Sequence, residues 1–234
     1  MSDPAVTANL SAVERLRENL AGVLEPDGDG HRAAAKRVAE SLRGAIEKLT
    51  ATTAPPEVLE AAAATMAEVV ALLDGYGSDR HYEGTAEGSG MGLNRAFLDW
   101  SPLTGLSNPL APPIHLSVEG SAVVGRVRFG PAYEGPPGCV HGGFVAAAFD
   151  EVLGVTQSLS GQVGMTGTLS VRYRRPTPLF EPLRFEGRLD SVSGRKVLTS
   201  AEVTVGGEVT AEATGLFIAV PPETFAALAG NRPG

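Results

Sequence analysis

The part of this sequence best suited to chemistry is a pair of glycines followed a few positions later by two acids. Residues 139–143 read CVHGG, and the small, apolar stretch 144–148 then leads to Asp150 and Glu151. Glycine has no Cβ, so a ligand can approach its backbone closely, and the first N–H groups of a helix have no partner within the helix. Such donors can polarise a carbonyl or hold an oxyanion. A tight turn from loop to helix is the structural alternative.

A carboxylate inside so apolar a helix is costly unless it has partners or a function. We therefore expect Asp150 to be buried, and either to act on a substrate or to be a satisfied structural acid. A positioned carboxylate can activate water as a general base or attack directly as a nucleophile. Glu151 points about 100° away around the helix. Glu151 is therefore expected to be a pairing or interface residue.

The segment resembles the His-Gly-Gly helix of hotdog-fold thioesterases, in the 4-hydroxybenzoyl-CoA and phenylacetate-pathway superfamily. In that family a catalytic Asp or Glu lies nine residues after the motif His, and Asp150 is nine residues after His141. Residues 169–179, LSVRYRRPTPL, are similar to the family's strand that ends in Tyr-basic-basic-Pro. The resemblance covers roughly residues 101–220. It implies an α+β hotdog fold, an antiparallel sheet wrapped around a central helix, and hydrolysis of acyl-CoA thioesters.

The resemblance also implies roles for single residues. It makes Asp150 the general base or nucleophile and the Gly142 N–H the main oxyanion donor, while Gly143 allows the substrate close approach. His141 caps the helix, orients the loop or contacts the thioester, and it is not assigned as the base. Thr166, sixteen residues after Asp150, matches a position where related enzymes place a hydroxyl that positions water; β-strand packing is the alternative. No metal or cofactor is implied, since CoA is part of the substrate.

A local excess of positive charge follows the motif. Seven of the 19 Lys and Arg residues fall between Arg172 and Lys196. CoA carries several phosphate charges, which guanidinium and ammonium groups can hold. Arg174, Arg175, Arg195 and Lys196 are therefore candidates to bind its nucleotide end, although a merely solvated strand face is the alternative.

The whole chain is acidic, with a formal net charge of −8. That balance argues against a nucleic-acid partner bound by bulk electrostatics. Its single cysteine excludes an internal disulfide, and no Cys/His cluster has zinc-ligand spacing. Asp3 and Glu14 stand where a signal peptide needs basic and apolar residues, and no run of ~18 apolar residues occurs. We expect a cytoplasmic protein without a membrane span.

Helical and β patterns of apolar residues divide the chain into four parts. Residues 1–78 carry three helical stripes of apolar residues and predict a helical extension, and residues 79–113, rich in Gly, Ser, Asn and Pro, predict an irregular connecting loop. Residues 114–220 predict the hotdog domain, and residues 221–234 a tail. Within the domain we expect a helix over 141–159 and strands over 114–118, 122–129, 164–175, 182–192, 195–205 and 208–219.

Helix geometry predicts a dimer. At ~1.5 Å rise per residue, Asp150 lies roughly 13 Å along the axis from His141, too far for both ends to serve one carbonyl. As the resemblance also implies, the site should combine the Gly142 end of one helix with the partner's Asp150 in a homodimer or a dimer of dimers. Acyl length and the choice between CoA and acyl-carrier-protein thioesters stay open. The alternatives are a noncatalytic acyl-CoA-binding protein and, less favoured, a hotdog dehydratase.

Overall fold

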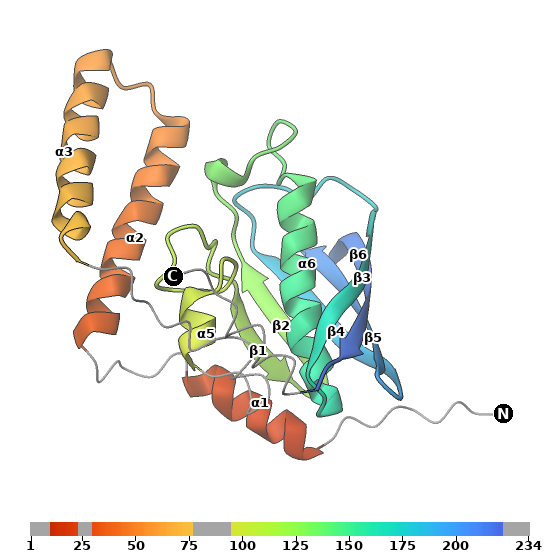
Figure 1. Ribbon diagram of the computed structural model, residues 1–234. Coiled ribbons are helices and arrows are strands. Elements are labelled where there is room, and N and C mark those ends of the chain that lie inside the picture. Colours follow the sequence, from red (N-terminus) through yellow and green to blue (C-terminus); the bar gives the residue numbers. More distant parts are fainter. Residues whose placement is uncertain (1–9, 23–29, 77–94, 222–234) are drawn as a thin grey trace.

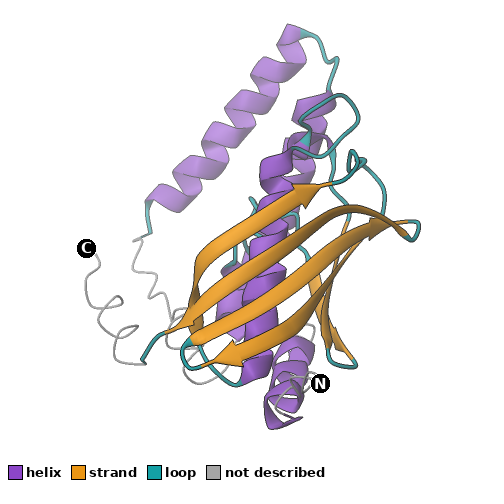
Figure 2. Cartoon of the chain, turned by 90° about the vertical axis from the view of Figure 1, so that its right-hand side faces the viewer, coloured by secondary structure: helices purple, strands orange, loops and turns teal. Residues whose placement is uncertain are grey.

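The sheet and the helix predicted from residue patterns are both present. A computed structural model of the chain describes residues 10–22, 30–76 and 95–221. Six antiparallel strands form one sheet in the order β1-β2-β4-β5-β6-β3. The strands are β1 (His115–Glu119), β2 (Ala122–Val127), β3 (Gly164–Tyr173), β4 (Leu183–Ser193), β5 (Lys196–Val205) and β6 (Glu208–Ala219). The sheet curves around one helix, α6 (Gly142–Gln157), so the predicted hotdog fold is confirmed (Figures 1 and 2).

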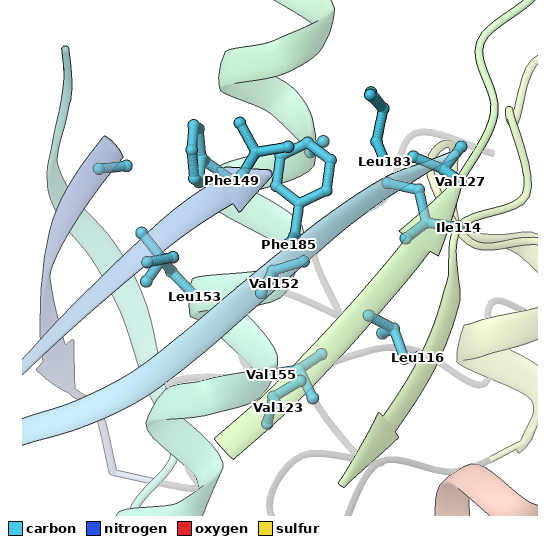
Figure 3. Packing of buried hydrophobic residues seen from close by; sticks show 14 of the residues in the cluster. Ile114, Leu116, Val123, Val127, Phe149, Val152, Leu153, Val155, Leu183 and Phe185 are labelled. Atoms are coloured by element: carbon cyan, nitrogen blue, oxygen red, sulfur yellow. The ribbon is translucent and has the colours of Figure 1, made fainter. Parts of the chain in front are cut away.

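The core lies between α6 and the concave face of the sheet. Phe149 of α6 meets Phe185 of β4 edge to face, with ring centroids 5.1 Å apart, and Val152 and Leu153 are fully buried beside them (Figure 3). Full burial of such a side chain stabilises the fold by roughly 1.5–3 kcal/mol. The helix sits close because β4 has a glycine beneath it: a Cβ on Gly187 would overlap the Thr156 hydroxyl.

Local signals explain why the strand bounds agree with the prediction. The first half of β4 alternates between buried and less buried residues, as a strand with one face on the core requires. Gly194, between β4 and β5, has a φ of 58°, and Gly206, between β5 and β6, has a φ of 57°. These left-handed conformations suit glycine and make the hairpin turns tight.

The N-terminal extension is helical, as predicted. Helix α1 (Leu10–Gly22) packs its buried side chains Val13, Leu16 and Leu20 against the β1 side of the domain. Helices α2 (Gly30–Ala51) and α3 (Pro56–Asp74) form a hairpin that projects from the body (Figure 1). No residue of α3 is buried, and Val58, Met66, Leu72 and Leu73 of its apolar stripe are exposed.

Charged and polar contacts attach α2 to the domain, together with the buried Ala39. Asp99 is fully buried and forms ion pairs with Arg32 and Lys36 of α2, the latter with a 3.5 Å separation. Arg43 donates hydrogen bonds of 3.2 and 3.0 Å to the backbone oxygens of Leu106 and Asn108. A buried carboxylate needs such partners, because desolvating an unpaired charge is expensive.

One element was missed in the predicted loop. Residues 79–113 contain a short helix, α5 (Arg95–Trp100), which carries Leu98 and Asp99 into the interior. Asp99 pairs with Arg32 and Lys36, more than sixty residues away, and local composition does not report such contacts. Residues 77–94 of this predicted loop, and residues 222–234 of the predicted tail, lie outside the described residues.

Candidate active site

His141 is the N-cap of α6. Its Nδ1 accepts a hydrogen bond of 3.0 Å from the Gly143 N–H, which satisfies one of the free donors at the helix start. In a neutral imidazole this leaves the proton on Nε2. Of the roles open for His141, capping is therefore the one seen in the structure. The bond also occupies the Gly143 N–H, so that group is not the free donor.

The Gly142 N–H is free to meet a ligand. Among the described residues, no group accepts a hydrogen bond from it. The preceding carbonyl, that of His141, accepts from the Phe144 N–H at 2.9 Å and from the Val145 N–H at 3.3 Å. The Gly142 carbonyl accepts a hydrogen bond of 2.7 Å from the Tyr173 hydroxyl. Both peptides that flank Gly142 are thus held while its own N–H stays open, as an oxyanion donor requires.

The loop before the helix is fixed by backbone hydrogen bonds. The His141 N–H donates to the Tyr133 oxygen, and the Val140 N–H donates to the Thr177 oxygen, both at 2.8 Å. The Tyr133 ring packs edge to face on Phe144, with centroids 4.9 Å apart. The motif is therefore presented by a rigid turn.

Asp150 is exposed in the single chain, which corrects the expectation that it is buried. It lies on the side of α6 next to β3 and stays accessible there. Its Oδ1 accepts a hydrogen bond of 2.9 Å from Thr166 Oγ1, and Thr166 is exposed as well. Two residues that the family resemblance selected are thus in direct contact. Because Thr166 is exposed, core packing does not explain its presence.

Glu151 is the less exposed of the two acids and is partly buried. Its Oε1 accepts hydrogen bonds from Ser101 Oγ at 2.9 Å and Thr104 Oγ1 at 3.2 Å. Burial raises the pKa of Glu151, the two hydroxyl donors oppose that rise, and the neighbouring charge of Asp150 adds to it. Glu151 is a pairing residue, as expected, and its partners tie α6 to the segment before β1.

One chain does not bring the two ends of the site together. Gly142 and Asp150 are eight residues apart on the same helix, which is about 12 Å along its axis. Tyr173 contacts the first end and Thr166 the second, so β3 follows the helix from one end to the other. The structure keeps the donor and the carboxylate separate, as the helix geometry predicted.

The four predicted phosphate ligands lie at two separate places. Arg174 donates to the Thr210 oxygen through its backbone N–H, near the start of β6, whereas Arg195 Nε donates to the Ala219 oxygen at its end, at 2.8 Å. Nine positions along a strand span roughly 30 Å. Within one chain, the four residues therefore do not form a single surface.

Their partners differ as well. Arg174 forms a salt bridge of 2.7 Å with Glu212, and Arg175 pairs with Glu208. Lys196 is exposed and forms no ion pair among the described residues. Arg174 and Arg175 lie beside the start of β6, and Arg195 and Lys196 lie beside its end. The sequence alone does not report which residues of neighbouring strands lie side by side.

The described residues contain no group of three His, Cys, Asp or Glu side chains that could hold a metal ion. None of the described helices is both long enough and apolar enough to cross a membrane.

Comparison with known proteins points in one direction. Residues 137–212 match the sequence profile of the thioesterase superfamily. A solved structure of a thioesterase superfamily protein has 34% sequence identity and a TM-score of 0.71, covering 83% of this chain and 97% of that one. Residues 79–234 are 156 of the 234 residues, about two thirds, so a match over 83% of the chain also takes in part of the N-terminal extension.

Curated relatives match over a shorter region. The Bos taurus protein named acyl-coenzyme A thioesterase THEM4 is 41% identical over 96 residues, 40% of this chain and 39% of that protein. The Mus musculus protein of the same name is 38% identical over 92 residues, 38% of this chain and 40% of that protein. The chain thus spans about two fifths of the length of the curated relatives it matches.

Proposed function

Because this chain belongs to the thioesterase superfamily, we propose that it hydrolyses acyl-CoA thioesters to a free acid and CoA. The observation that carries the proposal is that α6 has an open N–H donor at Gly142 and an exposed carboxylate at Asp150 held by the Thr166 hydroxyl. Thioester hydrolysis needs these two functions, stabilisation of the developing oxyanion and activation of the attacking oxygen. The names of the curated relatives support the same reaction.

In the first route, water attacks the carbonyl carbon while the Gly142 N–H donates to the carbonyl oxygen. Asp150 takes a proton from the water, and the Thr166 hydroxyl holds the carboxylate in place. The C–S bond then breaks, its electron pair leaves on the CoA sulfur, and the proton passes to that sulfur. In the second route, Asp150 attacks the carbonyl carbon and expels the CoA thiolate; water then hydrolyses the mixed anhydride and restores the carboxylate.

The proposal includes a homodimer that shares its sites. Most residues of β3 are exposed, and its outer edge has no strand partner among the described residues. Long uncovered edges invite pairing with another chain. Pairing of two copies along β3 would cover this edge and allow Gly142 of one chain and the partner's Asp150 to face one thioester.

A shared site would bring the two basic pairs together, namely Arg174 with Arg175 and Arg195 with Lys196. Arg174 and Arg175 directly follow Tyr173, which contacts Gly142. Arg195 contacts Ala219, which pairs with Gly164 at the Thr166 end of β3. In a dimer, Arg174 and Arg175 of one chain and the partner's Arg195 and Lys196 would flank the same site. We assign the nucleotide end of CoA to these groups.

The experiment that tests the function measures release of free thiol from short, medium, long and aromatic acyl-CoAs. Turnover that disappears in Asp150→Asn supports hydrolysis at this site. Tight acyl-CoA binding without thiol release would instead favour the noncatalytic binding protein. The cytoplasmic location, the role in fatty acid metabolism and the order of any assembly above the dimer stay predictions.

A further inference from the structure

We infer that Tyr173 is a positioning residue that sets the direction of the Gly142 N–H; the inference rests on the proposed function, in which that N–H meets the thioester oxygen. The Tyr173 hydroxyl donates a hydrogen bond of 2.7 Å to the Gly142 carbonyl across 31 positions of sequence. Tyr173 is 52% exposed in the single chain, so the bond is not needed there to satisfy a buried phenol. The effect of this bond is therefore to be sought at its acceptor, the Gly142 carbonyl at the start of α6.

Glycine by itself does not hold an N–H in one direction. It has no side chain to restrict φ and ψ, and the first turn of a helix lacks half of its backbone bonds. At Gly142, the peptide before it is held through the His141 oxygen, which accepts from the Phe144 and Val145 N–H groups. The peptide after it is held at one end by the Tyr173 hydroxyl and at the other by His141 Nδ1, through the Gly143 N–H.

The Tyr173 bond adds a second donor to the Gly142 carbonyl, which as the first carbonyl of α6 also faces the Ala146 N–H one turn further on. The Gly142 N–H lies in the peptide that Gly142 shares with His141. Holding the next peptide limits rotation about the Gly142 backbone between the two and so steadies that N–H. An oxyanion donor is effective because its direction is set before the reaction and needs no reorganisation during it. The phenol therefore acts on the oxyanion site through the backbone.

The ring of Tyr173 also closes the space above this backbone. A Cβ at Gly142 would lie 3.3 Å from both Cζ and Oη of Tyr173, which is tighter than most real contacts. Glycine at position 142 thus lets the phenol reach the carbonyl as well as letting a substrate approach.

The phenol itself rests on a fixed strand end. Tyr173 is the last residue of β3 and pairs with Ala211 of β6. The next two N–H groups, of Arg174 and Arg175, both donate to the Thr210 oxygen, at 2.8 and 3.0 Å. The end of β3 cannot shift without breaking these bonds. The sheet therefore fixes where the Tyr173 hydroxyl meets the start of α6.

The first test is Tyr173→Phe, which keeps the ring and removes the hydroxyl, with Tyr76→Phe at the exposed end of α3 as the matched control. We expect kcat for a good acyl-CoA substrate to fall about 2- to 12-fold, the factor that one net hydrogen bond gives. KM and Tm should change little, because the exposed phenol is not a core group. Unchanged kcat, or an effect confined to KM or Tm, would overturn the assignment.

A second measurement does not depend on turnover. In ¹⁵N-labelled protein, Tyr173→Phe should move the Gly142 and Gly143 amide resonances and speed their hydrogen exchange, while Tyr76→Phe leaves both unchanged. If the wild type releases no thiol, the proposed function fails, yet this measurement still tests the positioning. Amide resonances and exchange like those of the wild type would overturn it.

A third variant pair tests the steric contact. Gly142→Ala should disturb the same amides strongly in the wild-type background and less in a Tyr173→Leu background, which leaves room for the added methyl. Equal disturbance in both backgrounds would show that the ring does not press on this peptide.

Discussion

Thr166 and Asp150 form a hydrogen bond of 2.9 Å between the Thr166 hydroxyl and Asp150 Oδ1, and both side chains are exposed on the same side of the fold. The bond uses one carboxylate oxygen and leaves the other open. A hydroxyl in this position orients the acid without neutralising it. The open oxygen is then available to water or to a thioester carbon.

Asp150→Asn should preserve the fold and lower kcat by roughly 10²-fold or more, because the amide still accepts from Thr166 but can neither take a proton nor attack. Steady-state thiol release and circular dichroism on the same preparation check both parts. Near-normal turnover by a well-folded variant would remove Asp150 from the mechanism.

Thr166→Val keeps the branched shape and deletes the donor. We expect kcat to fall about 2- to 12-fold at nearly constant Tm, since one hydrogen bond is lost and no core contact is involved. The matched control is Thr168→Val on the same strand, whose exposed hydroxyl has no partner among the described side chains. A drop in Tm with normal kcat would mean that Thr166 serves packing instead.

Glu151→Gln should change how stability depends on pH. Burial raises the pKa of Glu151 above the value of 4.5 expected in the unfolded chain. The folded state therefore holds its proton more tightly, and this contribution to stability is present below pH 4.5 and is lost as pH rises through the folded pKa. Gln keeps an oxygen that accepts from Ser101 and Thr104 and has no proton to lose.

The measurement for Glu151 is the free energy of unfolding in urea for both proteins across this pH range. The wild type should lose stability relative to Glu151→Gln as pH rises above 4.5 and should then run parallel to it. A wild type that gains on the variant with rising pH would contradict the predicted direction of the pKa shift.

The two basic pairs predict a contrast between substrates. Neutralising Arg174, Arg175, Arg195 or Lys196 to Gln should raise KM for an acyl-CoA much more than KM for the matching acyl-pantetheine, which lacks the nucleotide phosphates. Lys196 should give the clearest result, because its removal breaks no ion pair among the described residues. Lys48→Gln, on the exposed end of α2, is the control. Equal effects on both substrates would place these residues in folding or chemistry.

The sequence predicted the elements better than their surroundings. Strand alternation and turn glycines such as Gly194 are local properties, so the strand bounds and α6 agree with the structure. Spacing showed that Asp150 and Glu151 point in different directions, but it did not show that Glu151 binds Ser101 and Thr104, nearly fifty residues away. The Tyr173 contact with Gly142 was missed for the same reason. The family motif included Tyr173 within residues 169–179, but only the fold shows that its hydroxyl binds the Gly142 carbonyl.

The shared site predicts complementation between two inactive chains. Gly142→Pro removes the N–H, and proline suits the first position of a helix; Gly142 does not have a positive φ, so the backbone permits it. The added ring must fit beside Tyr173, so folding is checked by circular dichroism. Asp150→Ala removes the carboxylate. Each homodimer should be inactive, because every site lacks one of the two groups.

A mixed dimer is expected to behave differently. One of its two sites pairs the intact Gly142 of the Asp150→Ala chain with the intact Asp150 of the Gly142→Pro chain, whereas the other site carries both defects. Chains with different affinity tags, co-expressed and purified through both, should therefore recover about half of the wild-type activity per dimer. A folded heterodimer as inactive as its parents, or an active wild-type species that sediments as a monomer, would show that each site is built from a single chain.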